Sequence, residues 1–288
     1  MFKRQRTGSV VCASCGNLVG VNDDRCYSCG RRNPGLWGFA PALRALGNDM
    51  GFLPFVTGLC VVMYVLSLLL SGGGLELGGG PMSFLSPSGC ALLKLGASGA
   101  VPVFGLDRWW SLLAAGWLHG GLLHIFFNMY WIRQLAPSVA DLYGPGRMVI
   151  LYTIGSIAGF FATSVAGNYL YFLPGPLAGA PLTVGASAPI FGLLGGLVYY
   201  GRRGGSSYIH GQAKSLAVVM FIFGLIMPGV DNYAHAGGFA GGWLAGRWLD
   251  PLKPERIDHL AIAVGCLGLS VLSILASFFM PLGIPDCF

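Results

Sequence analysis

Charged side chains are scarce in this chain. They make up 10% of its 288 residues, whereas apolar residues make up 54%, and a soluble globular domain carries about 25% charged residues. This shortage excludes an ordinary soluble domain and indicates an integral membrane protein. No stripe of basic residues interleaved with aromatics is present either, so the net charge of +6 gives no reason to expect a nucleic acid partner.

Apolar stretches long enough to cross about 30 Å of hydrocarbon recur along the chain. Seven spans are predicted, near residues 53–72, 117–136, 147–167, 185–201, 214–230, 235–249 and 258–280. The first begins too far from the N-terminus to be a cleaved signal peptide. We therefore expect an all-α polytopic membrane protein. Its divisions are a small module over 1–35, a linker over 36–52, a helical core over 53–250, and a last span with a short outer tail over 251–288.

The basic residues predict the orientation of these spans, because short cytoplasmic loops carry an excess of Lys and Arg. With the N-terminus in the cytoplasm, only Lys94 and Arg108 of the seventeen basic residues lie outside. The positive charge is then explained by contact with anionic lipid head groups. We expect a plasma (inner) membrane protein whose C-terminus lies outside.

Four of the eight cysteines form two C-x-x-C pairs in the N-terminal module, namely Cys12, Cys15, Cys26 and Cys29. Two such pairs present four thiolates to a tetrahedral zinc ion, and four protein ligands leave no open position for a catalytic water. A structural zinc ribbon is therefore predicted, with a redox pair as the alternative, and its partner is unknown. The other four cysteines are expected to be small apolar fillers or an exposed terminal thiol: Cys60, Cys90, Cys266 and Cys287.

Unusual polar residues occur at the same predicted depth in three spans. The second, fourth and sixth spans all run from outside to inside, and their first turns carry the following residues: His119, His124 and Asn128; Ser187; and His235. Polar groups within spans are costly and often functional. Because His124 and Asn128 are four residues apart, they share one helix face.

Small residues at four-residue spacing predict that the fourth and sixth spans touch closely. They are Ala188, Gly192 and Gly196 on one span and Gly238, Gly242 and Gly246 on the other. This contact would bring the Ser187 hydroxyl within reach of His235, the pairing of nucleophile and base that acyl transfer requires. Gly185 permits a tight entry to the span. The first backbone N–H groups of that span, with His124 and Asn128, could stabilise an oxyanion.

Three segments, HGGLLHIFFN, GASAPIFG and VDNYAHAGGFAGG, resemble the signatures of the rhomboid intramembrane serine proteases, and the resemblance covers about residues 90–250. It implies a six-helix bundle, here with one extra C-terminal helix. It also implies Ser187 as nucleophile, His235 as general base, His124 and Asn128 in the oxyanion hole, and a positional role for His119. The implied substrates are transmembrane segments of other proteins, cut near the outer face without a catalytic cofactor.

The chain departs from the family pattern at a few places. Ser111 stands where an arginine usually braces the first outer loop, and Arg108 nearby could replace it. Ala188, followed by Pro189, stands where glycine usually follows the nucleophile. Asp231 precedes His235 and could suggest a triad, but a helix cap is the better interpretation. Residues 227–232 join the fifth and sixth spans and are expected to act as a lid.

The sequence therefore predicts an intramembrane serine endopeptidase that uses a Ser–His dyad. The alternative is a catalytically inactive rhomboid-like protein that binds or escorts membrane clients, although such relatives generally lack the serine or the histidine. A transporter would call for charged residues near the middle of the membrane and for broken repeats, which the sequence does not have. The expected partners are transmembrane substrates, the bilayer and an unknown partner of the ribbon.

Overall fold

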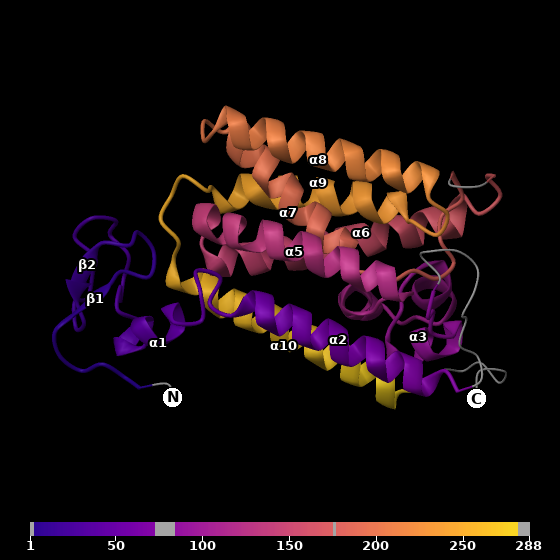
Figure 1. Ribbon diagram of the computed structural model, residues 1–288, viewed down its shortest axis with the longest axis horizontal. Helices are drawn as coiled ribbons and strands as arrows, with labels where there is room; N and C mark the ends of the chain where they lie inside the picture. Colours follow the sequence, from indigo (N-terminus) through magenta and orange to yellow (C-terminus); the bar gives the residue numbers. More distant parts are fainter. Residues whose placement is uncertain (1–2, 73–83, 175–176, 282–288) are drawn as a thin grey trace.

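Seven long helices dominate the computed structural model, which describes residues 3–72, 84–174 and 177–281. Each predicted span overlaps one of them (Figure 1). They are α2 (Phe52–Leu70), α5 (Leu122–Tyr143), α6 (Pro145–Tyr169), α7 (Ser187–Arg202), α8 (Ser207–Ile226), α9 (Asn232–Leu249) and α10 (Ile257–Phe279). The predicted all-α bundle with an added seventh helix is confirmed. Cys287 and nearly all of the expected outer tail lie outside the described residues.

Four of these helices, α2, α6, α8 and α10, are long and apolar enough to cross a membrane by length and composition alone. A fifth span is obtained if the short helices over Ser111–Trp117 and α5, which meet at 94°, are counted together. α7 does not meet this criterion because it has only 16 residues. α9 does not meet it because its glycines and polar residues lower its mean hydropathy. α7 is buried over most of its length, whereas α9 buries eight of its eighteen residues.

The N-terminal module is a small ribbon beside one end of the bundle, which we call the ribbon end (Figure 1). Its strands β1 (Ser9–Val11) and β2 (Leu18–Gly20) pair antiparallel. A 3-10 helix, η1 (Leu36–Gly38), and the short helix α1 (Ala40–Arg44) lead from the ribbon toward α2. The opposite end of the bundle, where α7 and α9 begin, is the far end.

Short helices fold the segment between α2 and α5 against the far end. They are α3 (Gly89–Leu95), η3 (Val101–Gly105), α4 (Ser111–Ala114) and η4 (Ala115–Trp117). Ser88 caps α3 by accepting a hydrogen bond from the Ala91 amide, and Gly96 ends the helix in a left-handed conformation, a common C-terminal signal. The described part of this segment is therefore folded into short helices, and it leads into the start of α5.

The centre of the bundle is formed by α6, α7 and α9, which meet through backbone contacts at glycines. A Cβ atom on Gly242 would lie 1.9 Å from the Gly192 carbonyl oxygen, and one on Gly155 would lie 2.7 Å from Gly192 Cα. Small-residue faces allow helices to approach this closely. The predicted contact between α7 and α9 is confirmed at Ala188–Gly238 and Gly192–Gly242. Further along, the two faces diverge, since Gly196 faces α6 and Gly246 meets tyrosine side chains.

Candidate active site

Ser187 is the first residue of α7, at the far end of the bundle. The turn before it depends on Gly185, whose φ of +135° is one that L side chains rarely adopt. A Cβ on Gly185 would lie 2.7 Å from His124 Nε2 and 3.7 Å from Ser187 Oγ. The absence of a side chain at this position therefore lets His124 approach the start of α7.

His235 lies on the first turn of α9 and faces α7. Its ring stacks on Phe191, with 4.2 Å between centroids and 13° between planes, and Phe191 follows Ser187 by one helical turn. One turn after His235, a Cβ on Gly238 would lie 2.2 Å from the Ala188 carbonyl oxygen. The parallel register of the two helices thus places Ser187 and His235 at the same level of a shared interface.

Among the described residues, no carboxylate is hydrogen-bonded to this histidine. His235 Nδ1 is buried and has no hydrogen-bond partner among the described residues. Asp231 is engaged elsewhere, because its Oδ1 accepts from the Ala234 amide at 3.0 Å and its Oδ2 accepts from Thr163 Oγ1 at 2.6 Å. The interpretation of Asp231 as a helix cap is confirmed.

The polar residues of α5 and of the turn before it lie beside this interface. His124 Nδ1 accepts from the Gly120 amide at 3.3 Å, and His119 packs edge-on against His124 with 5.2 Å between centroids. Asn128 Nδ2 donates to the His124 carbonyl at 2.9 Å. His119 is fully buried, and neither of its ring nitrogens has a partner within the described chain. The arrangement brings His124, Gly185 and Ser187 together, with Asn128 one turn deeper.

The segment before Ser187 is held by the short helices at the far end. Ser98 and Thr183 exchange two backbone hydrogen bonds of 3.0 and 2.7 Å, and the Gly185 amide donates to the Ala115 carbonyl at 3.0 Å. Ser111, in the place of the family's arginine, is buried and hydrogen-bonded to Ser98. The packing of this loop therefore fixes the path of the backbone into α7.

Arg108 braces the same loop against α10. Its Nη1 donates to the Leu93 carbonyl at 2.9 Å and its Nη2 to the Ser277 carbonyl at 2.8 Å. The guanidinium also lies 5.7 Å from the ring centroid of Trp110, whose Nε1 donates to Ser277 Oγ. The buried Arg108 thus ties α3 to α10 beside the first outer loop.

Replacing Arg108 by alanine is expected to lower the free energy of unfolding by about 2–4 kcal/mol, because two buried carbonyls lose their donor. Thermal unfolding in detergent measures this loss. Lys94→Ala, which removes an exposed contact to Met280, is the control and should be nearly neutral. An Arg108→Ala protein as stable as the control would show that the brace is dispensable.

The four ribbon cysteines form a second candidate site. Their sulfur atoms all lie within 4.8 Å of one another, with 3.8 Å between the sulfurs of Cys12 and Cys29 and 3.6 Å between those of Cys15 and Cys26. Four sulfurs at about 2.3 Å from one tetrahedral ion would be roughly 3.8 Å apart. The predicted four-cysteine ribbon is thus confirmed as a cluster that could hold a metal.

The protonation of the cluster is uneven. Burial raises the pKa of the Cys29 thiol to about 12. Burial also opposes ionisation of Cys26, but hydrogen bonds from the backbone of Cys29 and Ser28 outweigh it and lower the Cys26 pKa to about 7. A bound cation would have to displace the remaining thiol protons, because thiolates are the metal ligands.

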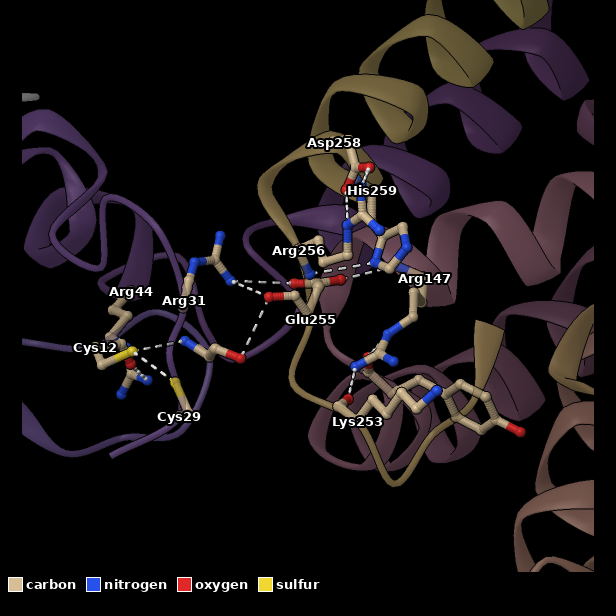
Figure 2. A network of polar contacts seen from close by, with 12 residues as sticks. Cys12, Cys29, Arg31, Arg44, Arg147, Lys253, Glu255, Arg256, Asp258 and His259 are labelled. Carbon is tan, nitrogen blue, oxygen red and sulfur yellow. Dashed lines mark hydrogen bonds and ion pairs between the residues drawn. The ribbon is translucent and has the colours of Figure 1, made fainter. Parts of the chain in front are cut away.

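Two buried charged residues at the ribbon end were not singled out in the sequence. Arg147 donates to the carbonyls of Leu249, Asp250 and Lys253. Glu255 forms an ion pair with Arg31 (Figure 2). Burial raises the Glu255 pKa against the opposing effect of the Arg147 amide. Nothing in the local sequence marks the contacts of Arg147 and Glu255, because their partners lie far away along the chain.

Cys90, which was expected to be a small apolar filler, is disulfide-bonded.

Comparisons with known proteins agree with this geometry. RHOMBOID-like protein 4 of Arabidopsis thaliana is 32% identical over 166 residues, which cover 56% of this chain and 39% of that protein. Rhomboid protease GluP of Bacillus subtilis (strain 168) is 31% identical over 171 residues, which cover 56% of this chain and 31% of that protein. RHOMBOID-like protein 6, mitochondrial, of Arabidopsis thaliana is 29% identical over 170 residues, which cover 57% of this chain and 51% of that protein.

The chain thus spans about a third to a half of the length of these relatives. A family model described as the Rhomboid domain matches residues 106–250, which include α5 to α9 and the whole candidate site. That match covers half of the 288 residues, so this integral membrane protein belongs to the rhomboid family.

Proposed function

We propose that this protein is an intramembrane serine endopeptidase that cuts transmembrane segments of other membrane proteins. The observation that carries the proposal is the register of α7 and α9, in which the Phe191–His235 stack and the Ala188–Gly238 contact set Ser187 and His235 at one level. A relative of 31% identity is a rhomboid protease by name.

In the proposed reaction, Ser187 Oγ attacks the carbonyl carbon of the scissile bond while His235 takes the hydroxyl proton. The C–N bond breaks as His235 returns that proton to the leaving amine. A water, deprotonated by His235, then hydrolyses the acyl-enzyme ester and restores Ser187. Because His235 Nδ1 has no carboxylate partner in the part of the chain that the structure describes, a dyad fits these residues better than a triad.

The developing oxyanion would be stabilised at the start of α7. The Ser187 and Ala188 amides lie in the first turn of that helix, where N–H groups have no partner within the helix. His124 lies beside Gly185, while Asn128 is hydrogen-bonded to its own helix. We therefore expect Asn128 to turn from the His124 carbonyl toward the oxyanion when substrate is bound.

Substrate entry is proposed at α8, the helix that is least held by the bundle. Only Ala213, Ala217 and Gly224 of its twenty residues are buried. Residues 227–232, which follow α8, would act as the lid over the site. A cross-link between α5 and α8 that leaves cleavage of a membrane substrate unimpaired would contradict entry between them.

The proposal is tested against its alternative, an inactive protein that binds or escorts membrane clients, by labelling with a fluorophosphonate probe. An activated Ser187 reacts covalently with the probe, and mass spectrometry of the labelled peptide identifies the residue. Labelling of Ser187 together with cleavage of a transmembrane substrate in proteoliposomes supports the protease. Retention of a membrane client with neither labelling nor cleavage favours the binding protein.

The proposed location is the plasma (inner) membrane, with the ribbon on the cytoplasmic side and the dyad near the outer face. The asymmetry of Lys and Arg supports this orientation. The disulfide at Cys90 and the free ribbon cysteines are also consistent with an oxidising far end and a reducing ribbon end. Cysteine accessibility labelling in intact and opened cells tests the orientation, and outer labelling of the ribbon would overturn it.

The proposed cofactor is one structural zinc ion in the ribbon, with none for catalysis. The spacing of the four sulfur atoms supports it. We expect about one zinc per chain after purification without chelators, and we expect acidification to release it because protons compete for the thiolates. Elemental analysis at neutral and acidic pH measures both effects. A protein that lacks zinc at neutral pH would remove this assignment.

A further inference from the structure

The cysteine cluster lies against the helix bundle, and both halves of the cluster contact one residue. From the first C-x-x-C pair, Ser14 Oγ donates to the Glu255 carbonyl at 3.5 Å. From beside the second pair, Arg31 Nη1 lies 3.4 Å from the same carbonyl and 3.8 Å from Glu255 Oε2. Figure 2 shows Arg31 approaching Glu255 from the ribbon side.

Among the described residues, Arg31 forms its side-chain hydrogen bond and its ion pair with Glu255 alone. Its side chain is fully buried, and its Nε and Nη2 atoms have no hydrogen-bond partner within the part of the chain that the structure describes. A buried guanidinium that loses its carboxylate is strongly destabilising. The position of Arg31 therefore depends on Glu255, and this polar contact joins the ribbon to the bundle beside the apolar packing of Ala13 and Leu36 with Ile257 and Leu260 of α10.

On the bundle side, Glu255 belongs to the connection between α9 and α10, residues 250–256. Its Oε1 accepts from the Arg147 amide at 2.9 Å. The Arg147 guanidinium in turn bonds the carbonyls of Leu249 and Asp250 at the end of α9 and that of Lys253. Arg147 Nε also donates to the Tyr143 carbonyl at the end of α5. Glu255 thus lies between the ribbon and Arg147, whose side chain bonds carbonyls at the C-terminal ends of α5 and α9.

The ribbon is too small to keep this shape by apolar packing alone. Its described core comprises Val10, Cys12, Val19, Val21 and Cys26, with Cys29 packed against it. Domains of this size usually need a metal or disulfides, and a structural metal supplies folding free energy directly. Since Ser14 and Arg31 come from opposite halves of the cluster, both can reach Glu255 only while the four sulfurs are held together.

We propose that the ribbon is a metal-dependent clamp whose partner is this chain's own α9–α10 connection. With the metal bound, Ser14 and Arg31 hold Glu255 and fix residues 250–256 against α6. Without it, the two halves separate, Glu255 loses both contacts, and the ribbon end of α9 loosens. This inference rests on the proposed zinc site but is independent of protease activity.

Amide hydrogen exchange of the full-length protein in detergent tests the clamp. Peptides covering residues 247–257 are compared in the zinc-loaded protein and after zinc is removed with a chelator. A cavity of about 380 Å³ lined by Cys15 and Glu255 gives the chelator a route to the cluster. We expect exchange in these peptides to rise at least about tenfold on removal, with little change in α7.

The variant Glu255→Gln separates the clamp from the metal site. It should still bind zinc, but it loses the ion pair of Arg31 with the carboxylate and keeps both bonds to the residue 255 carbonyl. Its 247–257 peptides should therefore exchange faster than those of the wild type with zinc bound, and should respond less to the chelator. Arg203→Gln is the matched control, because it removes an exposed ion pair to Asp250 in the same connection and should respond to the chelator as the wild type does.

The outcomes distinguish the two proposals. If the purified protein contains no zinc, the metal assignment fails and the clamp fails with it. If zinc is present and its removal leaves exchange at 247–257 unchanged, the clamp alone is wrong. The wild-type measurement decides this even if Glu255→Gln fails to fold.

Discussion

Replacing Ser187 by alanine is expected to lower kcat for cleavage of a transmembrane substrate by at least about 10⁴-fold, because the nucleophile of a serine hydrolase has no substitute. His235→Ala is expected to cause a loss of similar size. The double variant should be no slower than either single variant, since the two side chains act as one unit. Cleavage in proteoliposomes, with the protein at saturating substrate, measures all three.

Ser164→Ala is the matched control for this series. Ser164 is a buried serine of α6 whose hydroxyl donates to the Phe160 carbonyl within its own helix, and its loss should leave kcat almost unchanged. Thermal unfolding of each variant separates a chemical defect from a folding defect. Equal cleavage by wild type, Ser187→Ala and His235→Ala would sink the proposed mechanism.

The second large effect is expected at the contact of α7 and α9. Gly242→Ala places a Cβ atom 1.9 Å from the Gly192 carbonyl oxygen, and backbone cannot move aside as a flexible side chain can. Overpacking of this kind costs about 3 kcal/mol or more. We expect a large fall in the unfolding temperature and, because the same contact sets the level of His235, a loss of probe labelling at Ser187 under conditions where the variant is still folded.

Gly268→Ala provides the control for the second prediction. Gly268 also lies within a long helix, α10, but a Cβ there would meet nothing within 4 Å. Alanine is the better helix former by about 1 kcal/mol, so this variant should be as stable as the wild type or slightly more stable. Similar unfolding temperatures for Gly242→Ala and Gly268→Ala would show that the helices do not pack as described.

The sequence predicted the long helices well because their cause is local. Apolar runs of the right length and small-residue spacing are read directly from neighbouring residues. The predicted boundaries differ from the structure where the chain bends. The second span was predicted to begin at residue 117, but the chain bends by 94° before α5 begins at Leu122. The divergence at Gly196 and Gly246 was also missed, because spacing alone cannot fix how far two faces stay together.

The candidate site was predicted in outline because five polar residues occur at one predicted depth in three spans. The structure places His124, Gly185 and Ser187 together and aligns His235 with Phe191. The stacking on Phe191 and the bond of Asn128 to its own helix had no signal in the sequence. Neither had Glu255 and Arg147, because a buried charge can be inferred only once its partner, more than a hundred residues away, is known to lie beside it.

The contact between Arg31 and Glu255 joins residues 224 positions apart, and this separation has a consequence for biogenesis. A chain is synthesised from its N-terminus, and contacts between distant residues form late. The ribbon, α2 and α5 to α9 all leave the ribosome before Glu255 does. The ribbon can therefore dock only after the helices from α2 to α9 have been synthesised. Docking then reports that the connection between α9 and α10 is in place.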